Sequence, residues 1–141
     1  MKTVLIIEDD PAILALMHHV VESDGYAVLD AASADEAFRQ FEANDAHVDL
    51  LITDVSLGSS FGLRVALELW SLLPDLRIVI SSGYPQSMWP DQDVAELDEY
   101  SSDSIVILQK PFLPATLLDT VHRLIGCSQG MAPAVKLKAA S

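Results

Sequence analysis

Acidic residues follow directly after a short apolar run near the start of the chain. The stretch VLIIEDDPA places Glu8, Asp9 and Asp10 immediately behind Val4–Ile7. Burying a charge without a partner is strongly unfavourable, so these carboxylates are expected to meet a positive species. A second apolar run, DLLITD, also ends on a carboxylate, Asp54.

A hydroxyl group and a lysine follow two later apolar runs. Ser82 lies in the stretch SSGY, and Lys110 lies in the stretch KPF. Ligand sets made only of oxygen select a hard cation, usually Mg²⁺ where few carboxylates contribute and water completes the octahedron. A lysine ammonium is suited to holding a phosphate oxygen. Carboxylates, a metal, a hydroxyl and a lysine together indicate phosphoryl transfer.

Short apolar runs alternate with segments of helical periodicity along the chain. The runs predict buried strands at Val4–Ile7, Tyr26–Leu29, Asp49–Asp54, Arg77–Ile80 and Ile105–Leu108. The periodic segments between them predict helices, so we expect a parallel sheet covered on both faces. Ligands of such sheets bind beyond the carboxyl ends of the strands, which is where the acids, the hydroxyl and the lysine fall.

Local signals set the expected helix ends. Asp10 is expected to cap the helix that begins at Pro11 rather than to bind metal. Ser33 with Glu36 predicts a capping box. His18 and His19 are interpreted as ordinary histidines on a helix surface.

Composition narrows the class of protein. The 141 residues predict a single domain over 1–126 and a flexible tail over 127–141. A net charge of −13 with only eight basic residues argues against direct contact with nucleic acid. The single cysteine fits a reducing cytoplasm. The chain has no apolar run near the roughly 20 residues of a membrane helix, so we expect a cytoplasmic protein without a membrane contact.

With these motifs in order, the chain resembles the receiver domain of two-component response regulators, the CheY-like superfamily, from Lys2 to about Gly126. The matching motifs are EDD, DVSLGSSFG at Asp54–Gly62, SSGY and KPF. The resemblance implies an α/β fold with a single doubly wound, five-stranded parallel sheet. It also implies the (βα)5 flavodoxin-like topology, with strand order 2-1-3-4-5.

The resemblance implies a Mg²⁺ site made by Glu8, Asp9, Asp54 and the backbone carbonyl of Ser56. Asp54 matches the family's phosphoacceptor. The phosphoryl group is expected to come from a histidine kinase or a phosphotransfer protein.

The remaining roles follow from the same resemblance. Ser82 matches the hydroxyl residue that contacts the phosphoryl group, and Lys110 matches the family's lysine. We expect a stand-alone phosphoprotein that signals to a downstream protein target through surface contacts. It is not expected to be an enzyme beyond catalysing its own phosphorylation and dephosphorylation.

Two positions depart from the family pattern. Gly58 stands where a proline is usual, and Ile107 stands where an aromatic residue is usual. Since an isoleucine cannot turn inward as that aromatic residue does, we expect switching to show in the backbone after Gly83 and in Pro85–Ser104. For the latter segment the sequence also predicts a short helix around residues 94–97.

Two alternatives to this function stay open from the sequence. The first is a Mg²⁺-dependent phosphatase of the class that works through an aspartyl phosphate. Those enzymes carry an Asp-x-Asp pair at the end of the first strand, where this chain has Glu8, Asp9 and Asp10, so the nucleophile here would be Glu8. The second is a degenerate receiver that serves only as a protein scaffold.

Overall fold

The computed structural model describes residues 1–55, 61–84, 95 and 104–126. Within these residues, five parallel strands form one sheet in the order β2-β1-β3-β4-β5. The strands are β1 (Thr3–Ile7), β2 (Ala27–Ala31), β3 (Leu50–Asp54), β4 (Arg77–Ser82) and β5 (Ile105–Gln109). This order confirms the flavodoxin-like topology that the resemblance implies.

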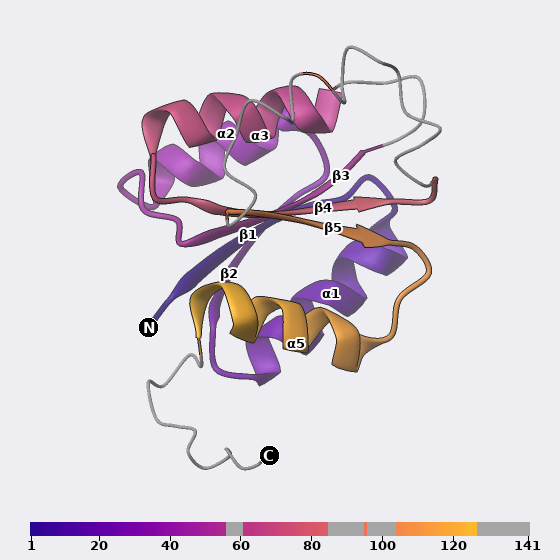
Figure 1. Ribbon diagram of the computed structural model, residues 1–141. Coiled ribbons are helices and arrows are strands. Elements are labelled where there is room, and N and C mark those ends of the chain that lie inside the picture. Colours follow the sequence, from indigo (N-terminus) through magenta and orange to yellow (C-terminus); the bar gives the residue numbers. More distant parts are fainter. Residues whose placement is uncertain (56–60, 85–94, 96–103, 127–141) are drawn as a thin grey trace.

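Helices cover both faces of the sheet, as the doubly wound prediction requires. They are α1 (Pro11–Ser23), α2 (Ala34–Ala43), α3 (Phe61–Leu72) and α5 (Pro114–Ile125). Figure 1 shows α2 and α3 on one side of the sheet and α1 and α5 on the other. Of the helix predicted around residues 94–97, the structure describes only Ala95, which is helical, and the tail over 127–141 lies outside the described residues.

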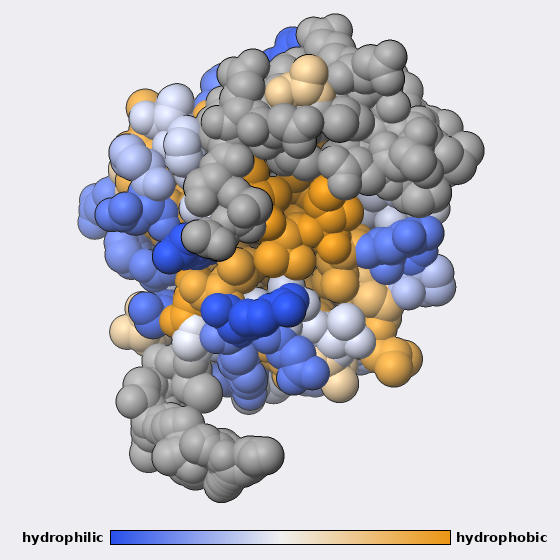
Figure 2. All heavy atoms as spheres, viewed as in Figure 1, coloured by the Kyte–Doolittle hydropathy of each residue, from blue (hydrophilic) through white to orange (hydrophobic). Residues whose placement is uncertain are grey.

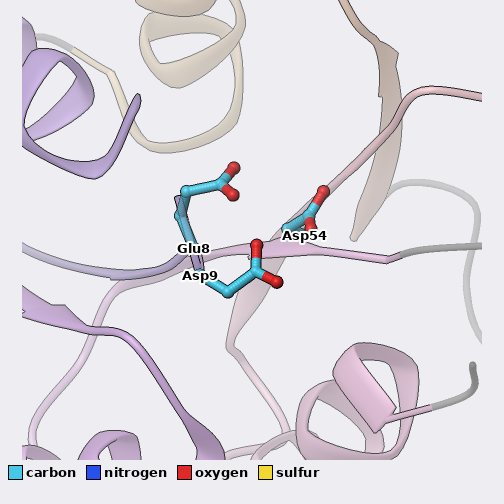
Figure 3. Close-up of side chains that lie close together, drawn as sticks. All are labelled: Glu8, Asp9 and Asp54. Carbon is cyan, nitrogen blue, oxygen red and sulfur yellow. The ribbon is translucent and has the colours of Figure 1, made fainter. Parts of the chain in front are cut away.

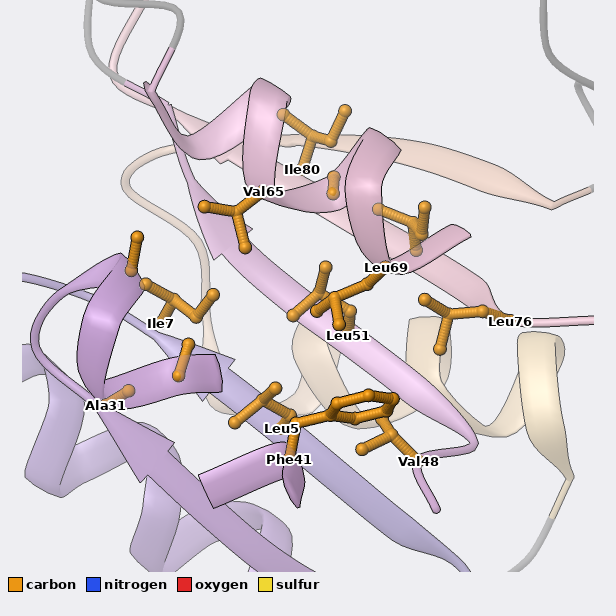
Figure 4. Packing of buried hydrophobic residues seen from close by; sticks show 14 of the residues in the cluster. Leu5, Ile7, Ala31, Phe41, Val48, Leu51, Val65, Leu69, Leu76 and Ile80 are labelled. Carbon is orange, nitrogen blue, oxygen red and sulfur yellow. The ribbon is translucent and has the colours of Figure 1, made fainter. Parts of the chain in front are cut away.

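Two apolar clusters hold the helices against the sheet. Successive strand residues point to opposite faces, so each central strand contributes to both clusters. The cluster beneath α2 and α3 includes Leu5, Leu51 and Ile80, packed with Phe41 and Leu69 (Figure 4). The cluster beneath α1 and α5 is built from the alternate strand positions, namely Val4, Ile6, Leu50, Ile52, Val79 and Leu108.

The edge strand β5 is less buried than the sequence predicts. Leu108 is buried, but Ile105–Ile107 are only half-buried. Figure 2 shows apolar side chains gathering over the β4–β5 side of the sheet, above α5. A strand at the sheet edge has a neighbour on one side only, and the apolar run by itself does not reveal that position.

Two helix starts test the predicted caps. The Asp10 carboxylate accepts hydrogen bonds from the N–H groups of Ala12 at 2.9 Å and Ile13 at 3.4 Å, which confirms the cap of α1. Ser33 Oγ accepts from the N–H of Glu36 at 3.2 Å. The return half of the predicted capping box is wrong, because Glu36 Oε1 accepts from the N–H of Ala32 at 2.6 Å rather than from Ser33.

Across the described parts of the chain, no helix is both long enough and apolar enough to span a bilayer.

Candidate functional site

The charged side chains converge at the carboxyl edge of the sheet because the strand register places them on one face. Glu8 lies two residues beyond Ile6, and Asp54 lies two residues beyond Ile52. Lys110 stands in the same relation to Leu108. Ile6, Ile52 and Leu108 all belong to the cluster beneath α1 and α5. The period-two alternation of strands therefore carries all three charged side chains toward that face.

Three carboxylates form a compact oxygen cluster at this edge. One carboxylate oxygen from each of Glu8, Asp9 and Asp54 lies within 4.8 Å of the other two. Figure 3 shows the three side chains at the ends of neighbouring strands, with Asp9 and Asp54 bordering the same space. Glu8 is buried, Asp54 is half-buried and Asp9 is exposed. The cluster thus opens outward, as a site for a partly hydrated cation requires.

Lys110 supplies the positive charge that this edge needs. Its ammonium lies 2.6 Å from Glu8 Oε1 and 2.9 Å from Asp54 Oδ1. Burial alone would lower the pKa of Lys110, but the hydrogen bonds to Glu8 and Asp54 outweigh it and leave the pKa raised. Lys110 is therefore held as an ammonium ion between two carboxylates, and the peptide bond to Pro111 that follows is cis.

Glu8 is the most deeply buried charge of the group, with 1% of its surface exposed. Burial raises the pKa of Glu8, and the hydrogen bonds from Lys110 and from the N–H of Asp10 only partly offset this. The N–H of Asp10 lies 3.2 Å from Glu8 Oε2. A raised pKa means that the ionised form of Glu8 depends on nearby positive charge. Lys110 is thus a positive species of the kind that the sequence led us to expect beside these carboxylates.

The predicted hydroxyl residue, Ser82, lies at the carboxyl edge of the sheet, but its hydroxyl bonds to the backbone of Tyr84 rather than to the charged cluster. It lies two residues beyond Ile80, on the α2–α3 side of the sheet, and is fully buried. Ser82 Oγ donates to the carbonyl of Tyr84 at 3.0 Å and accepts from the N–H of Tyr84 at 3.1 Å. The structure therefore brings Glu8, Asp9, Asp54 and Lys110 together but leaves Ser82 bonded to its own loop. The remaining predicted ligand, Ser56, lies outside the described residues.

Sequence reasoning missed a second hydroxyl, that of Ser81. This residue pairs with Asp54 in the β3–β4 register and lies two residues beyond Val79 of the α1–α5 cluster. Its side chain therefore faces the same side of the sheet as Asp54. Ser81 shares the parity of Val79 along β4, whereas Ser82 shares that of Ile78 and Ile80, and the apolar run alone does not tell which of the two faces carries the site.

Comparison with known proteins gives one family match and several relatives. A family model described as the response regulator receiver domain matches residues 4–122. The sensor kinase CckA of Brucella abortus (strain 2308) is 29% identical over 123 residues, which cover 87% of this chain and 12% of the kinase. The response regulator receiver protein CpdR of the same strain is 24% identical over 126 residues, covering 89% of this chain and 98% of CpdR. The chain spans only 12%, 26% and 43% of the first three curated relatives.

Solved structures agree with this match. The chemotaxis protein CheY4 of Vibrio cholerae superposes with a TM-score of 0.71 at 25% identity, covering 89% of this chain and 99% of that chain. The receiver domain of the hybrid histidine kinase CckA gives a TM-score of 0.66 at 26% identity, covering 87% of this chain and 99% of that chain.

Proposed function

Since this chain belongs to the family of response regulator receiver domains, we propose that Asp54 accepts a phosphoryl group from a histidine kinase or a phosphotransfer protein. Receiver domains act in two-component phosphorelay signalling with such partners. The observation that carries the proposal is the double contact of Lys110 with Glu8 and Asp54. It gathers a carboxylate nucleophile, a second acid and a fixed cation at the carboxyl ends of three separate strands.

The proposed chemistry is an in-line displacement at phosphorus. A carboxylate oxygen of Asp54 attacks the phosphorus atom of a phosphohistidine, and the new O–P bond forms as the P–N bond breaks. The imidazole nitrogen leaves with the electron pair of that bond. Lys110 exchanges its contact with Asp54 for a phosphoryl oxygen, where its ammonium stabilises the developing charge.

We also propose that Glu8, Asp9 and Asp54 hold Mg²⁺, together with the backbone carbonyl of Ser56. The donor set supports this, because three carboxylates face one ammonium and all their ligand atoms are oxygens. When bound, Mg²⁺ supplies further positive charge for the phosphoryl oxygens. Asp9, exposed at the mouth of the cluster, is the acid best placed to take a hydrated ion from solvent.

Ser82 completes the proposed phosphorylated site. Its hydroxyl leaves the backbone of Tyr84 and donates to a phosphoryl oxygen. Because that hydroxyl now fixes the turn at Gly83 and Tyr84, the exchange changes the backbone after β4. This is where the sequence predicts the switch, although residues 85–94 and 96–103 lie outside the described part of the chain.

We further propose that the protein acts as a stand-alone receiver in the cytoplasm and signals to a protein target. CpdR, of which this chain covers 98%, supports a single-domain arrangement. The net charge of −13 supports a protein partner rather than nucleic acid. In this proposal the chain catalyses only its own phosphorylation and dephosphorylation.

A labelling experiment tests the proposal. Protein is incubated with phosphoramidate as a small phosphodonor, with Mg²⁺ or with a chelator, and followed by intact mass. We expect one phosphoryl group per chain, dependent on Mg²⁺ and labile to base, in the wild type and in Asp75→Asn, which changes an exposed acid before β4. Asp54→Asn is expected to stay unlabelled while remaining folded.

Other outcomes would contradict the proposal. Steady release of phosphate from many small phosphate esters would favour the phosphatase alternative. Complete absence of labelling in the folded wild type would favour the scaffold.

A further inference from the structure

Ser81 lies in a row of side chains that crosses the sheet beneath the site. In the strand register, Ser81 pairs with Asp54 on one side and with Leu108 on the other. Neighbouring strands lie about 4.8 Å apart, and paired residues point to the same face. The side chains of Ser81 and Asp54 are therefore direct cross-strand neighbours on the same face of the sheet.

Lys110 passes over this row. It follows β5, and β4 separates β5 from β3 in the sheet. To place its ammonium 2.9 Å from Asp54 Oδ1 and 2.6 Å from Glu8 Oε1, the Lys110 side chain has to cross the end of β4 on the α1–α5 side. That is the side on which Ser81 lies.

The Ser81 hydroxyl is buried without a hydrogen-bond partner. The residue is 1% exposed, and its Oγ has no partner in the described part of the structure. By contrast, the other serine of the pair, Ser82, bonds to Tyr84 through both its proton and its oxygen. An unpaired buried hydroxyl lowers the stability of the resting fold, where an alanine would not. Residues that cost stability in this way are concentrated at functional sites.

We propose that Ser81 is a positioning residue for the phosphoacceptor. Its hydroxyl donates a hydrogen bond to the Asp54 carboxylate oxygen that Lys110 releases when the ammonium turns to the phosphoryl group. This bond fixes the carboxylate plane, so that the other oxygen faces the phosphorus atom. The inference rests on the proposed function of Asp54 and adds a second, distinct serine to the site.

Two measurements on four variants test this role. Melting temperature is measured without phosphodonor, and the labelling rate is measured as a function of phosphoramidate concentration in Mg²⁺. The variants are Ser81→Ala, Ser81→Thr, Ser82→Ala and, as a control, Thr120→Val. Thr120 is also buried, but its hydroxyl is satisfied by the carbonyl of Thr116 within α5 at 2.9 Å.

The expected results separate positioning from packing. Ser81→Ala is expected to melt at or above the wild-type temperature, because it removes the unpaired hydroxyl. Its maximal labelling rate is expected to fall about 3- to 10-fold, the value of one hydrogen bond, with the half-saturating phosphoramidate concentration unchanged. Ser81→Thr keeps the hydroxyl and is expected to label within about 2-fold of wild type. Ser82→Ala is expected to melt lower, and Thr120→Val to label at the wild-type rate.

One result would overturn the inference alone. If the wild type is labelled on Asp54 and Ser81→Ala is labelled at the same rate, Ser81 has no positioning role and the proposed function stands. If the wild type is not labelled at all, both are overturned.

Discussion

At the scale of single residues, the site depends on how Lys110 offsets two carboxylates. Glu8 is buried and its pKa is raised mainly by that burial, so it relies on the ammonium 2.6 Å away. The sequence predicted the identities of Glu8, Asp54 and Lys110 because each follows an apolar run. It did not predict the direct pairing of Lys110 with Glu8, because that contact joins residues 102 positions apart and depends on how the side chains pack at the edge of the sheet.

Lys110→Met tests this pairing through stability. The substitution keeps most of the apolar stem of the side chain but leaves Glu8 buried without its cation, so the free energy of unfolding is expected to fall by about 1–3 kcal/mol. Added Mg²⁺ is expected to recover part of the loss. Chemical denaturation with and without the metal measures both effects. Lys2→Met, at an exposed lysine before β1, is the control, and equal stability of the two variants would contradict the pairing.

At the scale of elements, a histidine joins α1 to β2. His18 Nδ1 lies 2.6 Å from Asp30 Oδ2 on β2, and its Nε2 lies 3.4 Å from Glu22 within α1. The hydrogen bond to Asp30 raises the pKa of His18 above its ordinary value of 6.5, although burial acts in the opposite direction. The sequence interpretation of a surface histidine was incomplete, because the helical pattern alone does not show which strand residue α1 packs against.

His18→Gln is expected to make stability respond differently to pH. The folded-state pKa lies above the unfolded one, so the charged histidine stabilises the fold fully below pH 6.5. That contribution is lost as the pH rises through the raised pKa. The variant is therefore expected to be less stable than wild type at acid pH, with the difference narrowing toward alkaline pH in denaturation curves. His19→Gln, exposed on the same helix, is the control; a pH-independent difference for His18→Gln would contradict the account.

At the scale of the whole molecule, the alternation of apolar runs and periodic segments was enough to predict the fold class and the edge that carries the site. Central strands are recognisable because both of their faces are buried, as in β1 and β3. The half-buried β5 and the role of Ser81 were beyond this reasoning. The expected strand order already placed β5 at the edge, but its degree of burial and the pairing of Ser81 with Asp54 depend on the packing and register of the assembled sheet.

Net charge also acts at this scale. The chain has a net charge of −13, so we expect it to repel duplex DNA. Binding to DNA requires basic groups that displace counterions from the phosphates. Fluorescence anisotropy with labelled duplexes at low salt is expected to show no binding before or after phosphorylation. A basic peptide is the positive control for the salt dependence, and sequence-specific DNA binding would contradict a purely protein-mediated output.

The most direct test of the central claim is to locate the phosphoryl group on the chain. After labelling in Mg²⁺, the acyl phosphate is reduced with borohydride, and the protein is digested and sequenced by tandem mass spectrometry. The account predicts a single reduced residue, Asp54. Reduction at Glu8 or Asp9, or a phosphoryl group found on His18 or His19, would contradict it.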